Sequence, residues 1–203
     1  MTAYLFLQVA RLHLSFYCYS ISKKLGLQSL KNKFMPITKA TKADVPQLNK
    51  LINSAYRGET SKKGWTTEAN LIDGIRVDEE ALNKYFEDPQ IIILKNVEPD
   101  GQITGTVYLE VRTPKLYVGM FSVSPTLQNS GIGRNLLLAA ESYAHELNCH
   151  TLTITVIGIR HELVSWYERR GFKATGEIQP FHDGSKFGVP KQHLDLIVME
   201  KDV

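Results

Sequence analysis

The sequence predicts an α/β fold, in which a mixed, mostly antiparallel sheet of about six to seven strands has helices on both faces. Two observations predict this fold. First, strand-like and helix-like apolar patterns follow one another after residue 35 in the order β-α-α-β-β-β-α-β-α-β-β. Second, the segment KLYVGMFSV (115–123) is almost wholly apolar after its first residue, as a central strand buried on both faces would be.

The first half of the domain is expected to hold one strand, two helices and a long loop. Residues 36–41 form a short strand candidate, and Asp44 is a plausible N-cap before apolar residues at helical spacing. Residues 57–77 are expected to be a loop with at most one turn of helix, and long loops inside compact domains are often functional. Residues 78–87 form a short helix that stops before a proline.

The second half is expected to hold the remaining strands and two more helices. A hairpin turn, EPDGQ, separates two strands that precede the central one. Amphipathic spacing predicts a strong helix after the central strand, and Gly171 closes a later, shorter helix. The expected elements are strands 91–97 and 103–112, helix 131–148, strand 151–157, helix 160–170, and strands 172–178 and 193–201.

Residues 1–34 are expected to be a basic leader, and residues 35–203 the folded domain. The leader's apolar stretch is broken by polar residues and is too short for a membrane span. It also lacks the positive start and the cleavage site of a secretory signal. Three interpretations stay open: an organelle transit peptide, a segment upstream of a true start at Met35, or an extra packed helix.

Composition argues against several classes of function. The leader up to residue 33 has five basic residues and no acid, and the rest of the chain has 19 basic and 21 acidic residues. No basic domain typical of a nucleic-acid binder is therefore expected. Cys18 and Cys149, the only cysteines, make neither a disulfide framework nor a zinc site, which favours a reducing, cytoplasmic location. No His pair has metal-ligand spacing with a third partner, so no metal is expected.

The segment GMFSVSPTLQNSGIGR (119–134) is typical of an anion-binding site, in which a strand runs through a loop into a helix. Gly131 and Gly133 lack Cβ atoms, so a ligand can approach the backbone closely. The first N–H groups of the helix have no intrahelical partner and favour a phosphate, and Arg134 adds a charge. The segment is not the dinucleotide fingerprint, because Leu136 stands where a third glycine is needed.

Two motifs together resemble the GCN5-related N-acetyltransferase (GNAT) superfamily. VSPTLQNSGIGRNLL (123–137) resembles its acetyl-CoA loop, and SWYERRGF (165–172) resembles its later helix. The resemblance covers residues 36–201, and GWTTEA (64–69) is similar to an uncharacterised subgroup. It implies the GNAT fold and an enzyme that moves an acetyl group from acetyl-CoA to a primary amine by direct attack.

The resemblance also implies which residues bind the donor. The backbone of Phe121 polarises the thioester carbonyl, and the backbone around Ser122 and Val123 pairs with the pantetheine arm. Arg160 stands where many relatives have Asn, so it contacts a cofactor phosphate or a substrate carboxylate, or it is a plain surface arginine. The pyrophosphate is held by Gln128, Asn129, Ser130, Gly131, Ile132, Gly133 and Arg134.

For catalysis, Tyr167 matches the general acid of the family, with a packing aromatic as the alternative. The general base is less defined, because Tyr117 takes the place of a Glu that some members use. Glu110 is the candidate base, with an exposed strand carboxylate as the alternative, and Glu68 is the reserve.

The acceptor pocket is expected between the loop after the first helix and the last loop. Arg57 would suit an acidic acceptor and Glu68 a cationic one, and the sequence does not distinguish between these two acceptor classes. A small-molecule amine is the favoured acceptor. A protein or peptide acceptor, or a non-catalytic acyl-CoA-binding domain, is the alternative, and a homodimer is kept open. The residues nominated are Tyr56, Arg57, Trp65, Thr66 and Glu68 on one side and Phe181, His182 and Phe187 on the other.

Overall fold

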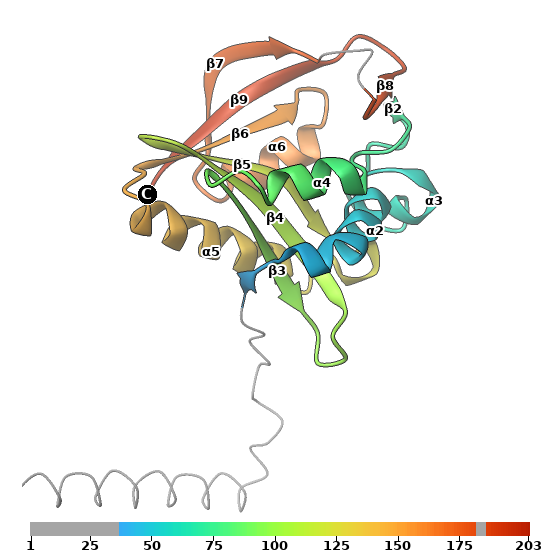
Figure 1. Ribbon diagram of the computed structural model, residues 1–203. Coiled ribbons are helices and arrows are strands. Elements are labelled where there is room, and N and C mark those ends of the chain that lie inside the picture. The colour runs from blue at the N-terminus through green and yellow to red at the C-terminus, as the bar shows by residue number, and fades with distance from the viewer. Residues whose placement is uncertain (1–36, 182–185) are drawn as a thin grey trace, which may run out of the picture. The chain divides into compact units, whose positions relative to one another are not determined.

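A seven-stranded sheet in the order β1-β3-β4-β5-β6-β9-β7 forms the centre of the protein (Figure 1). The structure, a computed structural model, describes residues 37–181 and 186–203. Every neighbouring pair in this sheet is antiparallel except β5 and β6, which are parallel. The predicted fold class is therefore confirmed. The predictions for residues 1–34 and for His182 lie outside the described residues.

The elements follow the predicted order with small differences at their ends. In the first half they are β1 (Thr38–Lys39), α2 (Val45–Tyr56), α3 (Gly58–Ser61), β2 (Ile72–Asp73), α4 (Glu79–Tyr85), β3 (Ile91–Val97) and β4 (Ile103–Arg112). In the second half they are β5 (Lys115–Val123), α5 (Ile132–Glu146), β6 (Thr151–Ile157), α6 (His161–Glu168), β7 (Lys173–Pro180), β8 (Val189–Pro190) and β9 (Asp195–Asp202).

Helices cover both faces of the sheet (Figure 1). One core forms where α2 and α4 pack on the strands, and it includes Leu48 and Leu82. The other core forms on the face covered by α5 and α6, and it includes Leu136, Leu152 and Phe172. Because β5 is the fourth strand of seven and is covered on both sides, its apolar composition is that of a buried central strand.

Strand β5 contains a bulge and then separates from β6. Thr106 and Tyr108 of β4 pair with Ser122 and Gly119, so an interval of two residues on β4 faces an interval of three on β5. Met120, in this interval, has a positive φ of 42°. The parallel pairing with β6 involves only the first three residues of each strand and ends at Tyr117. Beyond that point the two neighbouring strands leave a gap in the sheet.

The long loops have more structure than the sequence predicts. Residues 57–77 contain the helix α3 and the strand β2, which pairs with β8 from the last loop in a separate two-stranded sheet. The first strand is two residues long rather than six, because it pairs at the edge of the sheet with β3 alone. In the described residues, no helix combines the length and apolar character needed to cross a membrane.

Candidate active site

A cavity of about 560 Å³ lies in the gap between β5 and β6. Residues 117–121 of β5 and 154–157 of β6 form two of its walls. The hydroxyl groups of Tyr117 and Thr155 are 3.0 Å apart and bridge the strands where the backbone pairing stops. The remaining walls come from the loop before α5, from α6, and from the loops that carry β2 and β8. The separation of two neighbouring strands therefore creates the site.

The loop before α5 forms one end of this cavity, and its backbone takes a conformation that favours anion binding. Asn129 and Gly131 have positive φ angles of 68° and 93°. Gly131 caps α5, whose first N–H groups have no intrahelical partner. A Cβ atom added to Gly133 would lie 3.4 Å from Cε1 of Phe121, so a larger side chain here would crowd the cavity wall. This end of the site is built mainly from backbone groups.

Two arginines add positive charge beside this loop. Arg134 and Arg170 line the cavity, and neither forms an ion pair with a described residue. The Arg170 guanidinium lies 3.5 Å from the ring centroid of Trp166, and its Nη1 donates to the Trp166 carbonyl at 2.8 Å. Its Nε is buried and has no hydrogen-bond partner among the described residues. Burial, with Arg169 and Arg134 nearby, lowers the pKa of Arg170. An anion bound here would relieve this repulsion.

An aromatic cluster forms the middle of the cavity. Trp166 packs edge-on against Phe121 and against Tyr167, with centroid distances of 5.8 and 5.0 Å. Tyr167 is 6% exposed and lines the cavity, and its hydroxyl makes no hydrogen bond to a described residue. Burial raises the pKa of Tyr167, and the nearby Tyr56 raises it further. The phenol is therefore protonated at neutral pH and available as a proton donor.

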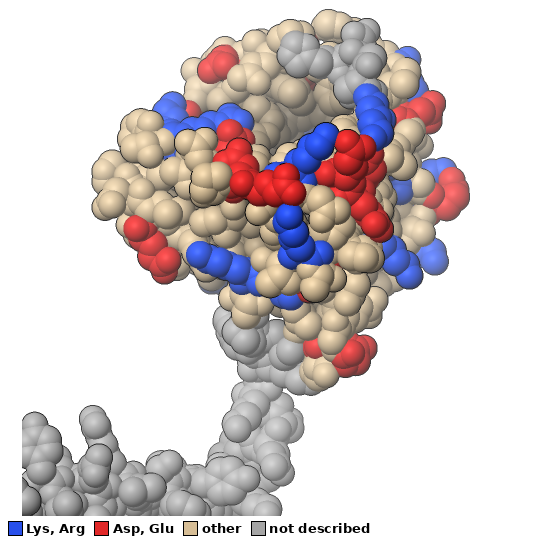
Figure 2. Space-filling view, viewed as in Figure 1, with Lys and Arg blue, Asp and Glu red and all other residues tan. Residues whose placement is uncertain are grey.

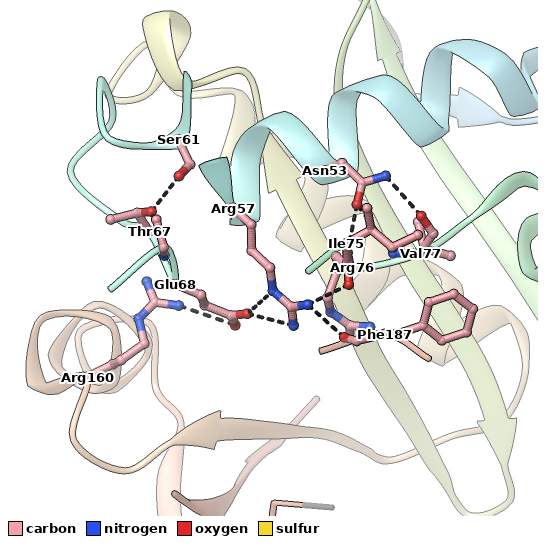
Figure 3. Close-up of polar contacts among 11 residues, drawn as sticks. Asn53, Arg57, Ser61, Thr67, Glu68, Ile75, Arg76, Val77, Arg160 and Phe187 are labelled. Atoms are coloured by element: carbon pink, nitrogen blue, oxygen red, sulfur yellow. Dashed lines mark hydrogen bonds and ion pairs between the residues drawn. The ribbon is translucent and has the colours of Figure 1, made fainter. Parts of the chain in front are cut away.

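A buried ion network closes the other end of the cavity (Figure 3). Arg57, Glu68 and Arg160 are only 7%, 7% and 5% exposed. Arg57 Nε and Nη2 each lie 3.4 Å from Glu68 Oε2, and Arg160 Nη1 lies 3.7 Å from Glu68 Oε1. Arg160 also donates to Thr66 Oγ1 and to Glu162. Both carboxylate oxygens of Glu68 are therefore engaged by guanidinium groups.

Arg57 also joins the two long loops. Its Nη1 donates to the carbonyl of Ile75 and, at 2.7 Å, to the carbonyl of Phe187 (Figure 3). These carbonyls lie beyond the same end of the β2–β8 pair, Ile75 after β2 and Phe187 before β8. Gly188 is needed at this place, because a Cβ atom there would lie 2.6 Å from Arg57 Nη1. Arg57 thus fixes the loops that close the cavity.

The charge of the cavity is unlike that of the outer surface. Of the described residues that line it, six are charged, five as arginine and one as Glu68. On the face that carries α4, acidic and basic side chains are interspersed (Figure 2). Lys84 pairs there with Glu80, and Lys186 pairs with Asp78. The cavity therefore has a strong positive bias that the net charge of the chain does not reveal.

Comparison with known proteins agrees with this geometry. Residues 67–187, more than half of the chain, match the family described as acetyltransferase (GNAT) domain. The chain belongs to the GNAT acetyltransferase family. The resemblance inferred from the two sequence motifs is confirmed at this level.

Solved structures of GNAT enzymes have the same fold. The ribosomal-protein-S18-alanine N-acetyltransferase of Escherichia coli superposes with a TM-score of 0.62 at 15% identity, covering 83% of this chain and 93% of that one. The ribosomal-protein-alanine N-acetyltransferase of Brucella melitensis gives 0.61 at 23% identity, covering 83% and 99%. Nourseothricin acetyltransferase gives 0.59 at 17% identity, covering 82% and 97%. Since these identities are below 25%, they show a shared fold.

Most residues nominated from the sequence of this GNAT domain lie around the one cavity. Phe121, Val123 and Tyr167 line it, as do Gln128, Asn129, Gly131, Gly133 and Arg134 of the loop and Tyr56, Arg57, Trp65, Thr66, Glu68, Arg160, Phe181 and Phe187 at the other end. Ser122, Ser130 and Ile132 are not lining residues. Ser130 Oγ instead donates to the Leu127 carbonyl at 2.6 Å, which holds the loop in shape.

Glu110 lies apart from the cavity lining. Its carboxylate accepts hydrogen bonds from Arg112 and, at 3.0 Å, from the hydroxyl of Tyr108. The hydrogen bond from Arg112 holds the pKa of Glu110 below its usual range. Its role as general base stays a prediction. No group of three or more metal-ligating side chains occurs among the residues that the structure describes.

The sequence prediction missed several cavity residues, among them Tyr117 as a lining residue, Arg76 and Arg170. Arg170 could have been found, because it lies three residues after Tyr167, on the same side of a helical turn. Arg76 carries no such signal. It lies at the end of the long loop, and only the fold brings it to Tyr56, whose ring centroid is 5.3 Å from its guanidinium carbon.

Proposed function

We propose that this protein is an N-acetyltransferase that moves an acetyl group from acetyl-CoA to a primary amine of a small molecule. The observation that carries the proposal is the cavity in the gap between β5 and β6. It has the start of a long helix at one end and the buried phenol of Tyr167 on its wall. A long ligand with an anionic end and a reactive thioester fits this arrangement.

The loop before α5 would hold the pyrophosphate of the donor. Its backbone N–H groups and the dipole of a 15-residue helix favour an anion, and Gly131 and Gly133 allow close approach. Arg134 and Arg170 add charge-assisted contacts. The donor chain would then run along β5 past Phe121, whose backbone N–H is a candidate to polarise the thioester carbonyl.

In the proposed reaction, the amine nitrogen attacks the thioester carbon, and the carbon–sulfur bond breaks. Tyr167 gives its proton to the departing thiolate and regains one, through solvent, from the amine that has become an amide. The amine must first be neutral. The positive charge of Arg57, Arg76 and Arg160 at the acceptor end disfavours a further positive charge there. It therefore lowers the pKa of a bound ammonium group. Glu68, whose oxygens are held by Arg57 and Arg160, serves the structure rather than proton transfer.

The walls of the acceptor end favour a small molecule over a peptide. Trp65, Phe181 and Phe187 line it, and the β2–β8 pair ties the surrounding loops together. A peptide or protein acceptor is the second candidate. It is favoured by one finding only, the likeness of the fold to two ribosomal-protein-alanine N-acetyltransferases.

The test is an acetyl-transfer assay with radiolabelled acetyl-CoA and two panels of acceptors, one of small amines and one of short peptides. We expect label in small amines, and a large loss of activity in Tyr167→Phe. Label confined to peptides would refute the small-molecule acceptor. Tight acetyl-CoA binding without transfer to any member of either panel would favour a non-catalytic acyl-CoA-binding domain.

A further inference from the structure

The acceptor end of the cavity contains a cation, Arg76, whose charge no described residue balances. Arg57 and Arg160 share the carboxylate of Glu68, and Arg160 also contacts Glu162. Arg76 lines the same cavity and forms no ion pair with any residue that the structure describes. With Arg57, Arg76 and Arg160 against Glu68 and Glu162, this end carries a formal charge of about +1. A buried or half-buried excess of positive charge favours an anionic ligand.

The backbone of Arg76 is held in place. Its N–H donates to Asn53 Oδ1 at 2.7 Å, and Asn53 Nδ2 donates to the carbonyl of Val77 at 2.9 Å (Figure 3). The guanidinium lies over the ring of Tyr56, 5.3 Å from its centroid. A cation–π contact of this kind does not use the N–H donors of an arginine as hydrogen-bond donors. Arg76 is therefore an ordered cation with unused donors.

Tyr56 connects Arg76 with the reaction centre. It lies at the end of α2, lines the cavity and influences the pKa of Tyr167. Arg76 in turn influences the pKa of Tyr56. An acceptor bound along the Tyr56 ring would thus have one end near Tyr167 and the other at Arg76. Apolar side chains such as Ile157 and Leu196 also line the cavity, which suits an acceptor with an apolar body.

We propose that the acceptor is an amino carboxylate, an amine whose carboxylate binds Arg76 while its amino group faces Tyr167. This inference rests on the proposed transferase function and adds the chemical class of the acceptor. A planar guanidinium binds a carboxylate through two parallel N–H···O hydrogen bonds, so a carboxylate fits Arg76 better than a neutral group does. Glu68 does not attract a cationic substrate group instead, because two guanidinium groups already occupy its oxygens.

The test is calorimetric binding to the full-length protein saturated with CoA. The ligands are the common L-amino acids, each compared with its α-amide and with the amine that lacks the carboxyl group. We expect at least one amino acid to bind about 10- to 100-fold more tightly than its amide. In Arg76→Gln the ratio of amino-acid to amide affinity falls to near one. Arg76→Lys restores part of the ratio, because lysine has the positive charge but not the two parallel N–H donors. Lys50→Gln, which removes an exposed cation on α2, leaves the ratio unchanged.

Two results would overturn the inference: no amino acid that binds more tightly than its amide, or an unchanged ratio in Arg76→Gln. The proposed function has a separate test, since the same ligands are also assayed for acetylation. Transfer to neutral amines without any preference for a carboxylate refutes the inference and leaves the transferase function intact. Carboxylate-dependent binding without acetylation supports the anion site and refutes the transferase function.

Discussion

The two ends of the cavity are built from different chemical groups, backbone groups at one end and side chains at the other. The end at α5 consists of one short loop, whose backbone N–H groups and glycines are adjacent in the sequence. The opposite end depends on side chains from distant positions, since Arg57, Glu68 and Arg160 meet only in the folded chain. A site made of backbone can keep its ligand while neighbouring side chains vary. A site made of buried side chains is sensitive to single substitutions.

The two ends should also differ in how much a substitution changes the stability of the protein. Removing one member of a buried ion network leaves an uncompensated charge, which costs more than losing an exposed contact. The loop at α5 contains no such network among the described residues. Substitutions at the acceptor end should therefore change stability, and substitutions at the donor end should change affinity.

The largest effect is expected for Glu68→Gln. This change leaves Arg57 and Arg160 buried without their shared countercharge, and we expect the free energy of unfolding to fall by about 3 kcal/mol in urea denaturation. The matched control is Glu162→Gln, because Glu162 also contacts Arg160 but its side chain is 47% exposed. The control should cost less than about 0.5 kcal/mol. Equal losses in the two variants would contradict the distinction between the two ends.

For Tyr167→Phe we expect kcat to fall about 100-fold, because the proton donor is lost while the ring is kept. The KM for acetyl-CoA and the unfolding midpoint should change little, since the Tyr167 hydroxyl makes no hydrogen bond to a described residue. Steady-state kinetics measure kcat and the KM, and a thermal melt measures the unfolding midpoint. Tyr143→Phe, on α5 and outside the cavity lining, is the control and should behave as wild type. A matching loss in the control would assign the effect to packing.

Stability at alkaline pH tests the burial of Tyr56. Desolvation raises the pKa of Tyr56 to about 12, above the ordinary value of 10.0. The unfolded chain therefore loses its proton first, so the stabilisation is complete below pH 10 and is lost as the pH rises toward 12. Between pH 9 and 11, wild type should lose about 1.4 kcal/mol more stability than Tyr56→Phe in urea denaturation. Parallel losses in the two proteins would show that Tyr56 ionises normally.

The smallest effect concerns the contact between the two ends. Gln128 Oε1 accepts a hydrogen bond from the N–H of Trp65 at 2.8 Å, which joins the donor loop to the acceptor wall. Gln128→Ala should raise the KM of the acceptor about fivefold, the equivalent of one hydrogen bond, with a smaller change in acetyl-CoA affinity. Gln102→Ala, on the exposed hairpin turn, is the control. A selective loss of acetyl-CoA affinity would place the Gln128 side chain on the donor instead.

The sequence predicted the fold and the loop that leads into α5 well for a physical reason. Strand alternation, helix spacing and the glycines before α5 are local patterns, and each occurs within a few residues of the structure it produces. Gly131 illustrates this, because its φ of 93° requires glycine and marks the start of α5. The first strand was predicted too long because its two-residue length depends on β3, a distant partner.

The acceptor end was predicted only in part. Arg57 and Glu68 were named as alternative anchors for acceptors of opposite charge, whereas in the structure they bind each other. Arg76 was not named, because neither its spacing nor its neighbours distinguish it from an exposed arginine. Contacts between residues 11 to 94 positions apart in the chain determine which of these charges are paired and which are not. Such contacts leave no local pattern in a single sequence.

Acetyl-CoA binding in this cavity is best tested by the affinity for acetyl-CoA when both glycines of the loop are replaced. In the Gly131→Val, Gly133→Val double variant, the added side chains fill the approach to the helix start, and we expect binding to weaken by at least about 100-fold. Gly101→Val controls for backbone strain, since Gly101 has a similar φ of 85° in a turn outside the cavity lining. Wild-type affinity in a folded double variant would contradict acetyl-CoA binding in this cavity.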